Sequence, residues 1–241
     1  MKGTEGMNKL RLKILYCAAA LILAAGLLYV GKEAAAYVMG KNMTGENRLC
    51  VMIDAGHGGM DPGKVGINGA LEKDINLKIA KALKKYLEAE DIEVVMTRES
   101  DDGLYDADAS NKKVQDMKRR VELIDTVKPA ITVSIHQNSY PEEYVYGAQV
   151  FFYSGSAEGR TLAEIIQTQL VDKVDPQNKR KVKANDSYYL LKKTGIPIVI
   201  VECGFLSNSA EAEKLCDEEY QERVAWAIHM GIMQYLNDSK N

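Results

Sequence analysis

The chain has little of several residue types, and each shortage excludes a class of site. Its four cysteines are Cys17, Cys50, Cys203 and Cys216, and no two of them have C-x-x-C spacing. This excludes a cysteine-ligated zinc site and a thioredoxin-like redox motif. The formal net charge of the 241 residues is only −3, and basic residues are interleaved with acidic ones. That pattern argues against nucleic acid as a partner.

Histidine is also scarce, so each one can be examined. The three histidines are His57, His136 and His229. His57 stands in the segment IDAGHGG, after the apolar run 49–53 and before a loop rich in glycine and proline. We expect a strand that ends at this loop and leaves the imidazole open to a metal or a substrate. His229 lies off the apolar face of a predicted helix, and we expect a surface histidine without a role.

The N-terminal region contains one long apolar run. Residues 14–30 carry no charge and are preceded by lysine and arginine, which predicts a signal anchor after a cytoplasmic basic tail at 1–13. A cleaved signal peptide is the alternative, because Ala34-Ala35-Ala36 offers a cleavage site. Residues 31–48 read as a linker, and a single folded domain is expected over 49–238, on the outer side of the membrane.

The folded domain alternates predicted strands with predicted helices. We expect strands at 49–53, 92–97, 130–135, 148–153 and 197–201, and helices at 72–89, 110–127, 156–173 and 219–236, with a short helix capped by Ser207 or Asn208. Ser110 should cap the second of the four longer helices, and Ser156 should open the third. Residues 175–184 should loop out, and 187–191 should form a short strand or a helical turn. Strand, helix and strand at these lengths predict an α/β class with a mostly parallel twisted sheet and helices on both faces.

Three predicted strands end in chemically reactive residues, namely His57, His136 and Glu202. Because the carboxyl ends of parallel strands share one edge of a sheet, these side chains should meet in one crevice. Glu72, at the start of the first helix, can return to the same edge. Two histidines and a carboxylate form a catalytic zinc set, and a further carboxylate can act as general base. Spacing alone does not say whether Glu72 or Glu202 is the ligand.

Four segments in this order carry a family resemblance: IDAGHGG, EKDINL, SIHQNS and VECGFLSN. Together they resemble the N-acetylmuramoyl-L-alanine amidases of the zinc-dependent amidase-3 family, and most of all its sporulation members, which act in spore-cortex maturation. The resemblance implies a six-stranded α/β catalytic domain that cleaves peptidoglycan between N-acetylmuramic acid and L-alanine. It also implies zinc on His57, Glu72 and His136, and Glu202 as the general base.

The resemblance has further implications and two departures. It implies action outside the cytoplasm, in the space where the cortex is built, and an activating partner protein, which some sporulation amidases need. No cell-wall-binding repeat is present, so tethering through residues 14–30 would have to localise the enzyme. The family commonly has proline where Ala55 stands, and Cys203 is an unusual neighbour for the base.

Three other interpretations use the same residues. Residues 58–64 fit the spacing of a phosphate-binding loop, but Val65 stands where serine or threonine should hold magnesium. A cysteine hydrolase would use Cys203 with His136. A non-catalytic or partner-dependent cell-wall-binding domain could keep all four polar residues without turnover.

Overall fold

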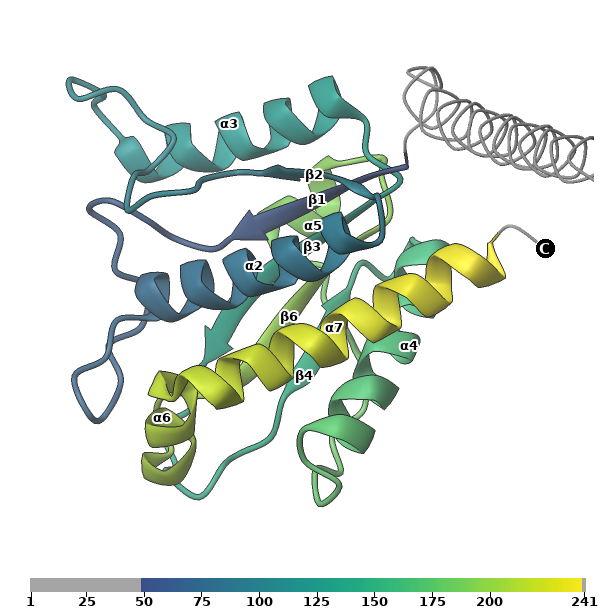
Figure 1. Cartoon of the computed structure of the whole chain (residues 1–241). Helices are drawn as coiled ribbons and strands as arrows, with labels where there is room; N and C mark the ends of the chain where they lie inside the picture. Colours follow the sequence, from purple (N-terminus) through teal and green to yellow (C-terminus); the bar gives the residue numbers. More distant parts are fainter. Residues whose placement is uncertain (1–48, 240–241) are drawn as a thin grey trace, which may run out of the picture. The chain divides into compact units, whose positions relative to one another are not determined.

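The structure, a computed structural model, describes residues 49–239 (Figure 1). The elements in chain order are β1 (Cys50–Ala55), α2 (Glu72–Ala89), β2 (Glu93–Met96), α3 (Lys112–Val127), β3 (Ile131–Asn138), β4 (Gln149–Phe152), α4 (Ala157–Lys173), β5 (Lys183–Ala184), α5 (Tyr189–Lys193), β6 (Ile198–Phe205), α6 (Ser209–Cys216) and α7 (Glu218–Asp238). All predicted strands and helices of the folded domain are present. The segment 175–184 differs from the expected loop, because β5 lies within it.

The six strands form one sheet in the order β2-β1-β3-β6-β4-β5. The first four strands in this order are parallel to one another. β4 runs antiparallel to β6, and β5 is parallel to β4. The predicted class, a mostly parallel α/β sheet, is confirmed. The four parallel strands bring their four carboxyl ends to one edge of the sheet.

The two faces of the sheet bury different sets of side chains. Val51, Ile53 and Ala55 of β1 point into the larger core with α2, α4, α6 and α7. Met52, between them in sequence, points to the other face and packs with residues of α3 and α5. Figure 1 shows α3 on one side of the sheet and α2, α7 and α4 on the other. Successive side chains in a strand point to opposite faces of the sheet, so every second residue of a central strand faces the α3 side.

Side-chain caps fix where three helices begin. Ser156 accepts a hydrogen bond from the Gly159 amide and caps α4, as the sequence predicts. Asn208 caps α6, which decides between the two candidates. For α3 the predicted cap, Ser110, is wrong by one residue, because the Asn111 side chain accepts from the Val114 amide at 3.1 Å. Serine and asparagine cap equally well, so local sequence does not separate them.

His229 is not the surface residue that the sequence suggested. Its exposed fraction is 3%. Its ring centroid lies 5.0 Å from that of Trp226 and 5.8 Å from that of Tyr86, and within residues 49–239 neither ring nitrogen has a hydrogen-bond partner. The reason is that α7 packs against both α2 and α4, so its buried surface is wider than one apolar stripe (Figure 1).

The buried His229 predicts a loss of stability in acid. Burial lowers the pKa of this imidazole below its value in the unfolded chain, about 6.5, although Glu90 partly opposes the shift. As the pH falls below that value the unfolded chain takes up a proton that the folded chain resists, so the free energy of unfolding decreases. In His229→Phe this decrease should be smaller. Urea denaturation of both proteins near neutral pH and in mild acid measures it, and identical pH dependence would contradict the prediction.

No helix within residues 49–239 is long and apolar enough to cross a membrane. The predicted signal anchor at 14–30 and the linker at 31–48 lie outside the residues that the structure describes.

Candidate active site

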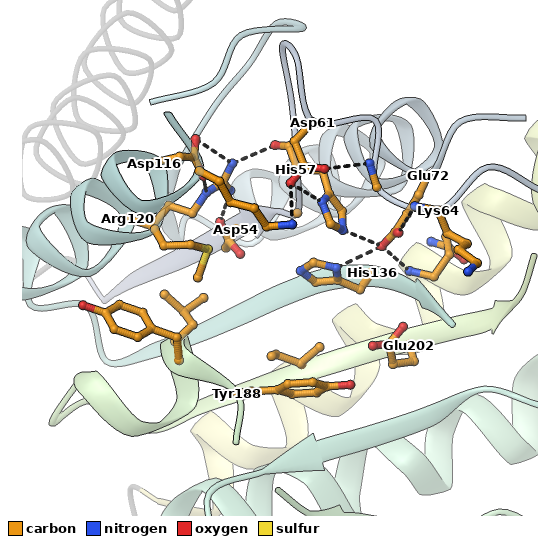
Figure 2. Close-up of a pocket in the computed structure, with 18 of the residues that line it drawn as sticks. Asp54, His57, Asp61, Lys64, Glu72, Asp116, Arg120, His136, Tyr188 and Glu202 are labelled. Carbon is orange, nitrogen blue, oxygen red and sulfur yellow. Dashed lines mark hydrogen bonds and ion pairs between the residues drawn. The ribbon is translucent and has the colours of Figure 1, made fainter. Parts of the chain in front are cut away.

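Three neighbouring parallel strands bring three of the predicted residues to one edge of the sheet. His57 follows the end of β1, His136 lies near the end of β3, and Glu202 lies within β6. His136 and Glu202 are paired neighbours across the β3–β6 ladder. Glu72 is the first residue of α2, and its side chain reaches the two histidines (Figure 2). The structure therefore brings all four predicted residues into one site.

His57, Glu72 and His136 form a group that can hold a metal ion. The Glu72 Oε1 atom lies 3.2 Å from His57 Nε2 and 2.9 Å from His136 Nδ1. One candidate ligand atom from each residue lies within 4.8 Å of the other two. Ligand atoms about 2.1 Å from a tetrahedral zinc ion stand about 3.4 Å apart. The spacing and the donor types therefore fit a zinc ion with a fourth position left open.

Glu72 is held as a carboxylate by contacts from several elements. Its exposed fraction is 3%. The Gln137 amide donates to Oε1 at 3.0 Å and the Lys64 amide donates to Oε2 at 2.7 Å. Burial alone would raise the pKa of Glu72, but hydrogen bonds from His136 and His57 outweigh it and hold the pKa well below the usual range. Glu72 is thus ionised and oriented for a cation.

Two glycines leave room for this group. A Cβ atom on Gly56 would lie 2.3 Å from the His136 ring, and one on Gly63 would lie 2.6 Å from both Glu72 Oε2 and His57 Cδ2. Such distances are far inside van der Waals contact, so no other residue fits without moving a candidate ligand. Gly56 in the segment IDAGHGG and Gly63 in the loop after it therefore serve the site by leaving space for the candidate ligands.

Glu202 lies beside the group without joining it. Its exposed fraction is 7%, and its Oε2 atom has no hydrogen-bond partner among the described residues. Burial raises the pKa of this carboxyl to about 7, with attraction from His136 opposing the shift and repulsion from Glu72 adding to it. A buried, unpaired carboxyl that titrates near neutrality is suited to accept and release a proton.

A cavity of about 740 Å³ opens over these residues. Volumes of this size hold drug-sized ligands. One wall is aromatic and apolar and comes from several loops and helices, with Met60, Tyr105, Met117, Tyr188, Tyr189, Leu190 and Ile200. Lys64, Lys112 and Lys113 also line it. The cavity can therefore accept a ligand with apolar and polar parts beside the metal-binding group.

The structure does not bring Cys203 and His136 together as a nucleophile and its base. Cys203 belongs to the core on the α2 side of the sheet, and its exposed fraction is zero. Glu202, one residue earlier, lines the cavity on the other face. Burial raises the pKa of the Cys203 thiol far above its ordinary value. A thiol in this position is neither ionised nor reachable, which removes the basis for a cysteine hydrolase.

Sequence reasoning missed a buried charged network beneath His57. Arg120 of α3 has an exposed fraction of 1%, and its Nη1 atom lies 2.5 Å from Asp54 Oδ1 (Figure 2). Burial would raise the pKa of Asp54, but Arg120 and a hydrogen bond from Ser134 lower it to about 2. A signal for Arg120 existed, because it stands four residues before Ile124, on the buried face of α3.

Comparison with known proteins is consistent with this site. The N-acetylmuramoyl-L-alanine amidase family Amidase_3 matches residues 51–234. The chain is 37% identical over 191 residues to the germination-specific N-acetylmuramoyl-L-alanine amidase of Bacillus subtilis, covering 78% of this chain and 80% of that protein. The structure is similar to that of the CwlD amidase from Clostridioides difficile in complex with the GerS lipoprotein, with a TM-score of 0.77 and 41% identity over 79% of this chain and 99% of that one. It is also similar to the amidase AmiC2 of Nostoc punctiforme, with a TM-score of 0.69 and 33% identity over 80% of this chain and 99% of that one. The chain therefore belongs to the N-acetylmuramoyl-L-alanine amidase family, and the activity expected from its four motifs is confirmed.

Proposed function

We propose that the chain uses zinc to hydrolyse the amide bond between N-acetylmuramic acid and L-alanine in peptidoglycan. One observation carries the proposal: a His/Glu/His group able to hold a metal lies in the same cavity as a buried carboxylate without a partner. In this proposal His57, Glu72 and His136 hold the ion. Two imidazoles, one carboxylate and an open position form a donor set of the catalytic zinc type.

Glu202 acts as the general base in this mechanism. When bound, zinc would polarise the scissile carbonyl and lower the pKa of a water molecule. Glu202 lines the same cavity, and no other described residue holds its Oε2 atom, so this carboxylate accepts the proton of the attacking water. Glu202 then donates that proton to the leaving nitrogen of L-alanine. The pKa of Glu202 is raised to about 7 by burial, and a cation held by the histidines would lower it, which would keep the base ionised at neutral pH.

The fixed hydrogen bonds of Glu72 separate its role from that of Glu202. Both Glu72 oxygens accept backbone amides, so its carboxylate is committed to one orientation. A ligand benefits from such orientation, whereas a base must exchange protons with substrate. This difference supports Glu72 as the ligand and Glu202 as the base.

We further propose that the enzyme matures the spore cortex from the extracytoplasmic side. The relative from Bacillus subtilis is named germination-specific. The similar CwlD amidase was solved with a lipoprotein, which supports a partner protein that activates this chain as well. The apolar residues 14–30 would tether the enzyme to the membrane.

Membrane tethering makes a simple prediction. The full-length protein should sediment with membranes at its intact mass, because an uncleaved apolar segment at 14–30 is held in the bilayer. Fractionation of expressing cells followed by mass analysis tests this. Recovery of only a soluble form that starts near Tyr37 would show a cleaved signal peptide instead.

Digestion of purified cortex peptidoglycan tests the proposed reaction. The products should be stem peptides with a free L-alanine amino group and glycan strands with peptide-free muramic acid, both identified by mass analysis. The Glu202→Gln variant under the same conditions is the control. If the wild-type protein binds the peptidoglycan and releases no new amino group, the chain is a cell-wall-binding domain and the proposal fails.

A further inference from the structure

Two buried arginines surround the backbone that carries His57. Arg98 follows β2, and Arg120 lies in α3, more than twenty residues later. Their exposed fractions are 5% and 1%. Both guanidinium groups face the turn at residues 55–57, which connects β1 to the loop of the candidate metal site. We call Arg98 and Arg120 the arginine pair.

The arginine pair binds three successive carbonyl oxygens of this turn. Arg120 donates to the Ala55 oxygen at 2.9 Å and to the His57 oxygen at 2.7 Å. Arg98 donates to the Ala55 oxygen at 3.0 Å and to the Gly56 oxygen at 3.1 Å. Every carbonyl of the turn is therefore fixed by a charged donor, and such hydrogen bonds are stronger than neutral ones.

His57 needs this support because its backbone conformation is unusual. Its φ angle is 64°, in the left-handed region that residues with a Cβ atom seldom occupy. Such conformations persist at functional sites only where the surroundings hold them. With the carbonyl turned toward Arg120, the His57 side chain points to the opposite side, where its Nε2 atom meets Glu72 (Figure 2).

The charge of Arg120 is balanced by two acids outside the candidate metal ligands. Arg120 pairs with Asp54 and with Asp116, and its Nε atom lies 2.6 Å from Asp116 Oδ2. Asp54 has an exposed fraction of 1% and also accepts from Ser134 and Thr97. Buried ion pairs add little stability compared with apolar residues of the same size. Stability alone therefore does not account for a charged network at this point, whereas positioning does.

We propose that Arg120, assisted by Arg98, is a positioning residue that fixes His57 in the geometry of a metal ligand. The inference rests on the proposed function, in which His57 holds zinc. When a residue that orients a metal ligand from behind is mutated, metal affinity typically falls by about 10–100-fold. Arg120→Lys keeps the charge near Asp54 but cannot form the fork that spans two carbonyls.

The test compares Arg120→Lys with Arg119→Lys in the full-length protein purified in mild detergent. Arg119 is the adjacent arginine, and it pairs with Asp106 at the protein surface. Zinc affinity is measured by competition with a chromophoric chelator, and the imidazole signals are followed by NMR without metal. The chain has only three histidines, so each signal can be assigned from single variants.

We expect Arg120→Lys to bind zinc about 10–100-fold more weakly. The His57 imidazole signals should shift or broaden, and those of the distant His229 should stay unchanged. Arg119→Lys should match the wild-type protein in both measurements. If Arg120→Lys does not fold, Arg98→Lys tests the same inference, because it loses the contacts to Ala55 and Gly56.

Two results separate failure of this inference from failure of the proposed function. Wild-type zinc affinity and unchanged His57 signals in a folded arginine variant would overturn the positioning role, even if His57→Ala loses zinc. Wild-type zinc affinity in His57→Ala would instead overturn the metal-ligand assignment itself. An equal loss of zinc affinity in Arg120→Lys and Arg119→Lys would also overturn the inference, because it would show an effect that does not depend on the contacts of Arg120 with the turn.

Discussion

Glu202→Gln should lower kcat by about 10²–10⁴-fold, the usual contribution of a general base, and leave zinc binding unchanged. Glutamine has the shape of glutamate but cannot take a proton from the attacking water. The fold should tolerate the change, because the Oε2 atom of Glu202 makes no hydrogen bond to any residue that the structure describes. Steady-state kinetics on peptidoglycan fragments and metal analysis of the same preparation measure both effects.

Cys203→Ala is the matched control for Glu202→Gln. The two residues are adjacent in β6, but Cys203 is packed in the core on the opposite face of the sheet. We expect this variant to keep turnover near the wild-type value. Near-normal hydrolysis by Glu202→Gln would refute the assignment of the base, and loss of turnover in a folded Cys203→Ala would revive the cysteine hydrolase.

The position of the site was predictable because strand direction is a simple constraint. His57, His136 and Glu202 each follow or end an apolar run, and βαβ connections make those runs parallel. The structure has β1, β3 and β6 as neighbours in the sheet, so the three ends lie side by side. The convergence thus follows from the order of apolar and polar residues along the chain.

The distinction between the two glutamates was not predictable from spacing. Glu72 and Glu202 both reach the same edge of the sheet, and either could face the histidines. What separates them is contact with backbone amides of other segments, including Lys64 and Gln137. Such contacts depend on how a loop and a strand meet in space, which local sequence does not encode.

Three other errors share one physical cause, which is tertiary packing that overrides local pattern. Arg120 stands in a highly charged helix. Its spacing to Ile124 suggests the buried face, but the ion pair with Asp54 of β1 is what distinguishes it from Arg119, which pairs with Asp106 at the surface. His229 was assigned to the surface because one apolar stripe was assumed for α7, which in fact packs against two helices. β5 has two exposed residues and no apolar side chain to bury against β4 beyond Ala184, so local sequence gives little sign of a strand there.

His57→Ala and His136→Ala should each lose zinc and, with it, turnover. Each variant removes one of three proposed ligands. Zinc affinity should therefore fall by more than the roughly 10–100-fold expected when only a residue that orients a ligand is mutated. Glu72 would also lose one of the hydrogen bonds that hold its pKa low. Metal analysis after dialysis and turnover with added zinc are the measurements. The proposed site contains both histidines, so the two variants should behave alike.

His229→Phe is the control, since it removes the third histidine of the chain at a buried position beside Trp226. It should keep about one zinc per chain and near-normal turnover. Chelation of the wild-type protein should abolish hydrolysis, and zinc should restore it. Full zinc content in either alanine variant would rule out its histidine as a ligand. Zinc loss without loss of turnover would separate the metal from catalysis, because Glu202 alone would then suffice to activate water.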